Sequence, residues 1–326
     1  MNRNRLFLDI ALNKFANLFS SWIVRHKRIF RYIVVIYCYF HKFRLRQVGE
    51  NYSLQLHTRS IIFSADQLYH CKDLINSFDF YFDSINLDSH EVKHVIDLSK
   101  PNFHSVKNWG YFDVHFPTFI ESIETSQQYI DLLQLSEGET VIDLGAYAGL
   151  SSMHFKNQVG PKGNVIAVEV DAISLQSTSI NFKNYQQLFG DCPKLIQCAA
   201  WSSDTEIDFL PEGNVGSSVL GINSRNQFYS RVPARTLSSI TRMSNSLKID
   251  AVKADIEGSE YEAFKDHNFF HHHRPRVVFE AILFGRKSPL YLKACDLLKN
   301  YGYSLQVFQQ SGSDQSLVLA TPIMMK

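Results

Sequence analysis

The sequence predicts an α/β fold: a Rossmann-like, doubly wound and mostly parallel sheet of seven strands, with an N-terminal accessory region. Three observations lead to this prediction. Short apolar strands alternate with segments of helical periodicity from residue 118 onward. A glycine-containing loop, D-L-G-A-Y-A-G at residues 143–149, lies between the first of these strands and the helix after it. An acidic residue, Glu169, ends the next strand, at the edge where doubly wound folds bind ligands.

The composition is that of a globular protein with reduced thiols. Of the 326 residues, 45% are hydrophobic and 20% are charged, and this length allows one catalytic domain plus an extension. The five cysteines are scattered, without a C-x-x-C pair or a His/Cys ligand spacing. We therefore expect a cytoplasmic protein and no disulfide framework.

Charge divides the chain into a basic head and an acidic body. Residues 1–46 carry ten Lys and Arg side chains against one acid, Asp9, so their net charge is +9, and the chain's total of +1 leaves −8 for the rest. We predict a basic, aromatic-rich helical extension over residues 1–48, an accessory region over 49–117 and the catalytic domain over 118–326.

The head has two interpretations. Its longest apolar run, residues 33–40, is too short to span a bilayer of about 30 Å, and no cleavage site of a secretory signal follows it. We favour a helix over residues 22–43 that packs on the body or on a second subunit. The alternative is peripheral contact with the anionic inner face of a membrane. Nucleic-acid binding is not expected, because no RNA or DNA motif accompanies the charge.

The elements of the catalytic domain follow from periodicity and end signals. A helix over 119–135 stops at Gly138, Gly160-Pro161 closes the helix over 151–159, and Asp171 caps a helix that ends near Gly190. The strands are predicted over 140–144, 164–170, 194–200, 249–254, 276–281, 304–309 and 316–320, with a β insertion over 205–236 and a last helix over 290–300.

The loop after the first strand is the primary candidate for ligand binding. Gly145 allows a sharp turn and a close approach of a ligand to the backbone. Asp143 can fix the loop and meet a cationic group, and Ala146, Tyr147 and Gly149 complete the loop. Because an acid replaces the first glycine of the dinucleotide fingerprint G-x-G-x-x-G, the pattern favours a ligand with an ammonium and a sulfonium and no phosphate.

Two further strand ends extend this site. Glu169 lies 24 residues after Gly145, where a carboxylate can accept both hydroxyls of a ribose, and Val170 follows it. The third strand ends at Cys198 and Ala199, whose small side chains leave room for a flat adenine ring.

These residues resemble the FkbM-type S-adenosylmethionine-dependent methyltransferases. The resemblance runs from about residue 138 to 282 and rests on the order and spacing of six pieces: VIDLGAYAGLSS (141–152), VGPKGNVIAVEVD (159–171), CAAWSSD (198–204), VPARTL (232–237), VKADIEGSEYEAF (252–264) and RPRVVFEA (274–281). It implies a class I methyltransferase sheet, S-adenosyl-L-methionine as cofactor, and O-methylation of a hydroxyl on a sugar, glycolipid or polyketide-like natural product. Tyr147 and Cys198 depart from the family, in which Asn is commoner at both positions.

Carboxylates gather on the predicted acceptor side. Asp255 and Glu257 follow a strand and precede a helix that Ser259 and Glu262 are expected to open as a capping box, and Glu280 lies near the end of the neighbouring strand. A carboxylate at this edge can take the proton that an acceptor hydroxyl loses. The alternative role is to hold a divalent cation that acidifies the hydroxyl.

Two nearby features have structural interpretations. Lys253 is interpreted as a buried salt-bridge partner, and the alternative role of Glu257 is only to complement the helix dipole. The three adjacent histidines at 271–273 lie on a predicted connecting loop and cannot all face one ion, so we expect a solvated loop and no metal site.

Two other functions compete with methyl transfer. An NAD-dependent oxidoreductase is disfavoured, because neither G-x-G-x-x-G nor a Ser/Tyr-x-x-x-Lys proton relay is present. A non-catalytic S-adenosylmethionine-binding protein is disfavoured, because Asp143, Gly145, Glu169, Asp255 and Glu257 are all present. The expected partner is a small-molecule or glycan hydroxyl acceptor.

Overall fold

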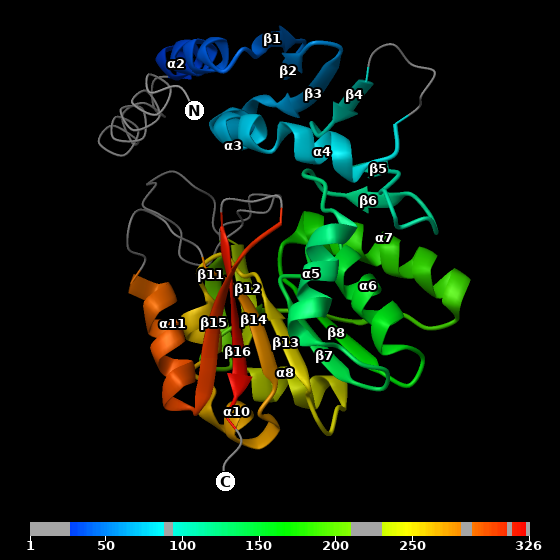
Figure 1. Cartoon of the computed structure of the whole chain (residues 1–326), viewed down its shortest axis with the longest axis vertical. Coiled ribbons are helices and arrows are strands. Elements are labelled where there is room, and N and C mark those ends of the chain that lie inside the picture. The colour runs from blue at the N-terminus through cyan, green and yellow to red at the C-terminus, as the bar shows by residue number, and fades with distance from the viewer. Residues whose placement is uncertain (1–26, 88–93, 210–229, 282–288, 312–314, 324–326) are drawn as a thin grey trace. The chain divides into compact units, whose positions relative to one another are not determined.

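A computed structural model describes residues 27–87, 94–209, 230–281, 289–311 and 315–323. The chain forms two units, Met1–Lys100 and Pro101–Lys326, which we call the N-terminal and C-terminal units (Figure 1). Residues 1–26 of the predicted basic extension and residues 210–229 of the predicted β insertion lie outside the described residues.

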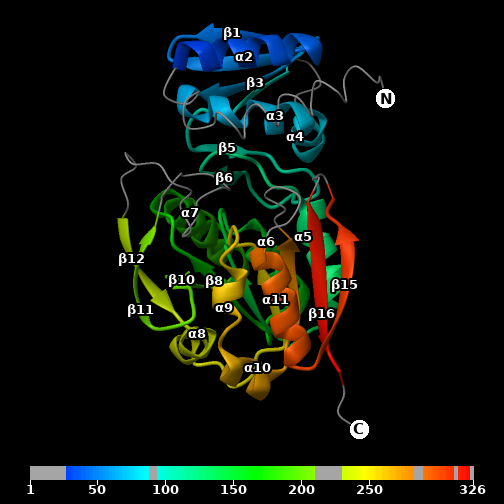
Figure 2. The same cartoon turned by 90° about the vertical axis from the view of Figure 1, so that its left-hand side faces the viewer.

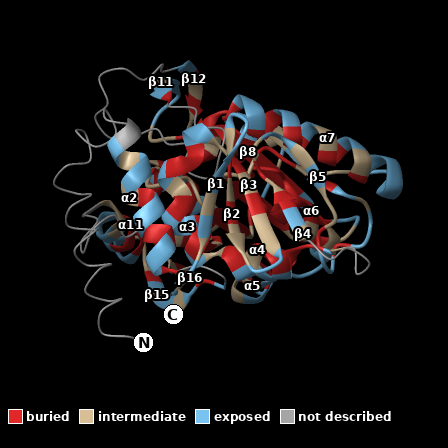
Figure 3. Ribbon diagram, turned by 90° about the horizontal axis from the view of Figure 1, so that it is seen from above, coloured by how far each residue is buried: buried red, intermediate tan, exposed pale blue. Residues whose placement is uncertain are grey.

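The N-terminal unit is a small sheet accompanied by short helices. Its elements are α2 (Lys27–Phe40), β1 (Arg44–Val48), β2 (Asn51–Leu56), β3 (Arg59–Ser64), a 3-10 helix (Ala65–His70), α3 (Cys71–Asn76), α4 (Phe78–Ser84) and β4 (His94–Asp97). The strands lie in the order β1-β2-β3-β4, antiparallel except for β3 and β4. Buried residues alternate along β2 and β3, as Figure 3 shows, because successive side chains point to opposite faces. Within the described residues, every helix is too short or too polar to cross a membrane.

The C-terminal unit opens with a hairpin of β5 (Asn102–His104) and β6 (Val114–Phe116). The backbone N–H and C=O of His115 in β6 are both hydrogen-bonded to the side-chain amide of Asn181, at 2.9 and 2.8 Å. Asn181 lies on α7 (Ala172–Phe189), so the hairpin is part of the larger unit.

Seven strands form the central sheet of this unit, in the order β15-β16-β14-β13-β7-β8-β9. Its strands are β7 (Thr140–Leu144), β8 (Asn164–Glu169), β9 (Lys194–Gln197), β13 (Ala251–Ala254), β14 (Arg276–Ala281), β15 (Tyr303–Gln309) and β16 (Ser316–Pro322). The five strands from β14 to β9 are parallel. Strand β16 runs antiparallel to both of its neighbours, β14 and β15, so β15 has the same direction as the five parallel strands. The predicted seven-stranded, mostly parallel Rossmann-like sheet is confirmed.

Helices cover both faces of the sheet because its strands are apolar on both sides. Val141 and Val165 pack with α5 (Ile123–Leu133) and α6 (Leu150–Val159) on one face. The next residue of each strand, Ile142 and Ile166, faces the other core. That core is covered by α8 (Leu237–Ser244), α9 (Glu260–Ala263), α10 (His267–His273) and α11 (Pro289–Asn300), which Figure 2 shows on one side of the sheet.

One predicted strand is wrong in its extent. Residues 194–200 were expected to form a single strand, but the chain leaves the central sheet after Cys198, whose N–H donates to the carbonyl of Glu169 at 3.1 Å. The next two residues form β10 (Ala199–Ala200), which pairs with β12 (Ser230–Arg235) in a separate sheet with β11 (Thr205–Phe209). The small side chains of β10 therefore lie where the two sheets meet.

Candidate functional site

A pocket of about 720 Å³, including its open mouth, lies at the carboxyl edge of the parallel strands. This place is typical of ligand sites in doubly wound folds. Eight predicted site residues line it: Gly145, Tyr147, Glu169, Val170, Cys198, Ala199, Asp255 and Glu257. Four predicted residues, Asp143, Ala146, Gly149 and Glu280, are not among the residues that line the pocket.

Asp143 is fully buried and holds the glycine loop from inside. Its Oδ1 lies 3.0 Å from Nζ of Lys253, and its Oδ2 accepts hydrogen bonds from the hydroxyls of Ser151 and Ser152 at 2.7 and 2.6 Å. The Lys253 ammonium also donates to the carbonyl of Gly145 at 2.8 Å. Lys253 is therefore a buried salt-bridge partner, as interpreted from the sequence, and together with Asp143 it fixes the backbone of the loop.

Neighbouring acids stabilise the charged form of Lys253. Burial alone would lower the pKa of Lys253, but the carboxyl groups of Asp143, Asp255 and Glu121 raise it overall. The ammonium consequently stays protonated, which a buried cation does only beside opposite charge.

Gly145 brings two loops into backbone contact. It has a φ of +74°, and a Cβ at this position would lie 1.9 Å from the carbonyl oxygen of Asp255. A larger residue would separate the loop after β7 from the loop after β13, so this position requires glycine.

Glu169 is oriented by the backbone around it. Its two oxygens accept three hydrogen bonds, from the N–H groups of Tyr147 at 2.8 Å, Val170 at 2.6 Å and Asp171 at 2.8 Å. Burial raises the pKa of Glu169 to about 7, and these donors oppose the rise. A carboxylate has about four acceptor positions, so about one is left for a ligand hydroxyl.

Tyr147 links the glycine loop to the segment before α5. Its φ is +51°, a left-handed conformation that Asn adopts more readily than Tyr. Its hydroxyl donates to the carbonyl of Phe119 at 3.0 Å and accepts from the N–H of Thr118 at 3.2 Å. The tyrosine side chain thus supplies a tether that an asparagine at this position could not reach to make.

Cys198 forms part of the pocket wall and is chemically quiet. It is almost fully buried, and burial raises the pKa of its thiol to about 12. A protonated thiol behaves as a small apolar side chain, so it adds to the apolar part of the lining with Val168, Ala199 and Phe209.

Glu121 is a lining residue that the sequence analysis missed. It precedes Ser122, the N-cap of α5, and its Oε2 is buried with no hydrogen-bond partner among the described residues. Burial raises the pKa of Glu121 to about 8, against the opposing effect of Lys253. An acid beside a helix N-cap usually only complements the helix dipole, so the sequence pattern alone did not mark it. Ser174 and Ile256 also line the pocket. The sequence analysis missed them because the sequence around them does not by itself suggest ligand binding.

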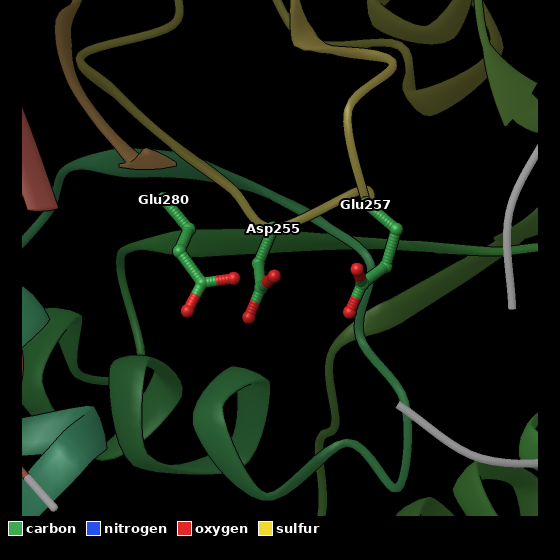
Figure 4. A group of neighbouring side chains, drawn as sticks. All are labelled: Asp255, Glu257 and Glu280. Atoms are coloured by element: carbon green, nitrogen blue, oxygen red, sulfur yellow. The ribbon is translucent and has the colours of Figure 1, made fainter. Parts of the chain in front are cut away.

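Asp255, Glu257 and Glu280 are brought together as predicted, with one oxygen of each within 4.8 Å of the others. Figure 4 shows the three carboxyl groups side by side, with Asp255 in the middle. Burial, reinforced by the charges of Asp255 and Glu257, raises the pKa of Glu280 well above its usual range. A side-chain hydrogen bond with Asp255 adds to this rise, which favours the protonated form of Glu280.

Left-handed backbone at Glu257 and Gly258, with φ values of +52° and +92°, turns the chain between Asp255 and α9. The predicted capping box at this turn is wrong. Ser259 makes no side-chain capping bond, and Glu262 instead accepts from Ser202 at 2.8 Å. Glu260 stabilises the turn, accepting from the N–H of Ile256 at 3.0 Å.

The histidines at 271–273 end α10 and do not lie on a loop, which corrects their predicted conformation. In the part of the chain that the structure describes, the carboxyl groups of Asp255, Glu257 and Glu280 lie close enough together to hold one ion, and these histidines form no such group.

Comparison with known proteins identifies the kind of domain. A family model described as the methyltransferase FkbM domain matches residues 143–305, half of the chain. No curated protein matches the chain.

Three solved structures illustrate distant similarity. Fibrillarin from Aeropyrum pernix, in complex with natively bound S-adenosyl-L-methionine, is 11% identical, with 85% of this chain and 97% of that chain covered and a TM-score of 0.40. The O-methyltransferase from Bacillus cereus in complex with SAH is 12% identical, with 63% and 84% covered and a TM-score of 0.42. A SAM-dependent methyltransferase from Aquifex aeolicus is 13% identical, with 61% and 89% covered and a TM-score of 0.35. These similarities are too distant to indicate a substrate.

Proposed function

The chain belongs to the FkbM family of S-adenosylmethionine-dependent methyltransferases, and from this premise we propose that it methylates a hydroxyl of a sugar, glycolipid or polyketide-like natural product. One observation carries the proposal: the carboxyl groups of Asp255, Glu257 and Glu280 converge beside the cofactor pocket, and the first two line it. A hydroxyl is the acceptor that most needs such a group, because it must lose its proton to become a good nucleophile.

The lining residues fit S-adenosylmethionine. Glu169 offers a carboxylate fixed by three backbone donors, which suits a ribose hydroxyl. Val168, Cys198, Ala199 and Phe209 offer an apolar wall for the adenine. When bound, S-adenosylmethionine supplies an electrophilic methyl group on a sulfonium, whose departure leaves a neutral thioether that needs no acid.

We assign the proton transfer to the carboxyl groups on the acceptor side of the pocket. Asp255 is the middle group of the cluster (Figure 4), and it shares a hydrogen bond with Glu280, whose raised pKa favours the protonated form. Asp255 is therefore the carboxylate that takes the hydroxyl proton, while the hydrogen bond from Glu280 fixes its orientation. A positioned general base of this kind typically contributes about 10²–10⁴-fold to the rate.

A divalent cation is the alternative role for the same three carboxyl groups. Hard oxygen ligands suit Mg²⁺ or Mn²⁺, and a bound cation would favour the ionised form of Glu280. Activity that EDTA removes and Mg²⁺ or Mn²⁺ restores would assign the cluster to a metal. Activity that EDTA leaves unchanged supports the direct base.

The proposal is tested by labelling with deuterated S-adenosylmethionine. A cell extract is incubated with the purified protein or with its Asp255→Asn variant, and the labelled products are identified by mass spectrometry. We expect products that carry the label on an oxygen and that are depleted with the variant. Label on nitrogen or carbon in the products that depend on the purified protein would overturn the proposal. Calorimetry that shows binding of NAD in place of S-adenosylmethionine would also overturn the proposal.

A further inference from the structure

Glu121 lines the pocket and has no role in the proposed proton transfer. Its buried Oε2 lacks a partner, although it lines the cofactor pocket. A buried oxygen without a donor costs free energy, so its position favours a ligand that supplies one. Among the described residues, the charges that act on Glu121 are the acids Asp143, Asp255 and Glu169 and the cation Lys253, so the surroundings favour a cationic donor.

The position of Glu121 is also fixed. Two residues earlier, the carbonyl of Phe119 accepts the Tyr147 hydroxyl, and one residue later Ser122 caps α5 by accepting from the N–H of Thr125 at 3.2 Å. A carboxylate held on both sides is preorganised for one ligand group and loses little freedom when it binds.

We infer that Glu121 accepts a hydrogen bond from the α-ammonium group of the cofactor's methionine part. The inference rests on the proposed function. Glu169 serves the ribose, and the ammonium is the cofactor's hydrogen-bonding cation, since the sulfonium carries no N–H or O–H. Glu121 would therefore distinguish ligands that carry the amino acid from those that lack it.

Calorimetry with two ligands tests the inference. S-adenosylhomocysteine carries the ammonium, whereas 5′-methylthioadenosine lacks the amino acid. Glu121→Gln should weaken binding of S-adenosylhomocysteine about 10- to 100-fold, as expected for a charged hydrogen bond, and leave 5′-methylthioadenosine unchanged. Glu124→Gln is the matched control, since this exposed acid lies three residues further along α5, and it should change neither affinity.

Equal weakening of both ligands would make Glu121 a structural residue of the pocket, and equal affinity in variant and wild type would remove it from the site. Either result overturns the inference alone. If the wild-type protein bound neither ligand, the proposed function itself would fail.

Discussion

The hydroxyl of Tyr147 donates to the backbone carbonyl of Phe119 at 3.0 Å, across 28 residues of sequence. This bond joins the glycine loop to the segment that carries Glu121. We predict that Tyr147→Phe, which removes only the hydroxyl, leaves the fold intact but weakens S-adenosylhomocysteine binding several-fold. The variant should affect binding of 5′-methylthioadenosine less, because the Tyr147 hydroxyl acts by positioning Glu121 and this ligand lacks the ammonium that Glu121 binds. Calorimetry with both ligands checks this, and equal losses would show that the tether supports the whole pocket.

The ion pair of Lys253 and Asp143 should dominate the stability of the site. Lys253→Met leaves a fully buried carboxylate without its counter-ion, which typically costs about 3–5 kcal/mol of the free energy of unfolding. Lys248→Met is the control, because Lys248 is 71% exposed in its pair with Asp250 and such pairs contribute about 0–1 kcal/mol. Urea denaturation of both variants measures the difference, and similar losses would contradict the prediction.

Asp255→Asn should reduce turnover by about 10²-fold or more, because it removes the base and keeps the shape of the side chain. Cofactor affinity should stay within a few-fold of wild type. Glu262→Gln, on α9 outside the pocket, serves as the control and should turn over normally. Single-turnover rates with a saturating acceptor show whether Asp255→Asn slows methyl transfer. Normal turnover by Asp255→Asn would move the search for the base to Glu257 or Glu280.

Cofactor affinity should rise with pH. In the free protein burial raises the pKa of Glu121 to about 8, so the group is mostly neutral at pH 6 and ionises as the pH rises toward 8. An ammonium ligand binds the ionised form better, so the dissociation constant of S-adenosylhomocysteine should fall between about pH 6 and 8. Glu169, with a pKa raised to about 7, adds a dependence that 5′-methylthioadenosine shares. The ratio of the two dissociation constants isolates Glu121, and this ratio should become independent of pH in Glu121→Gln.

The parts of the fold that local patterns determine were predictable. The strand at Thr140–Leu144, the helix capped by Asp171 and the convergence of Asp255 with Glu280 follow from periodicity and from strand ends meeting at one edge. The break after Cys198 was not predictable, since residues 194–200 have the continuous pattern of one strand and the new partner, β12, lies more than 30 residues later.

Long-range contacts also decided the roles within the site. Asp143 was expected to meet a cationic group of the ligand. It is instead paired with Lys253, which lies on a strand 110 residues later in the sequence. Glu121 is significant only because its Oε2 is buried beside the pocket. Neither property is visible in a linear pattern, since each depends on which elements pack together.

The contact between Gly145 and the carbonyl of Asp255 has a consequence for how substrate range can change. The main chain, not any side chain, sets the separation between the loop after β7 and the loop that carries the proposed base. Substitutions of acceptor-facing side chains leave this separation as it is. Substitutions in the opposite wall of the pocket can therefore admit a new acceptor while the separation between the glycine loop and the proposed base stays the same.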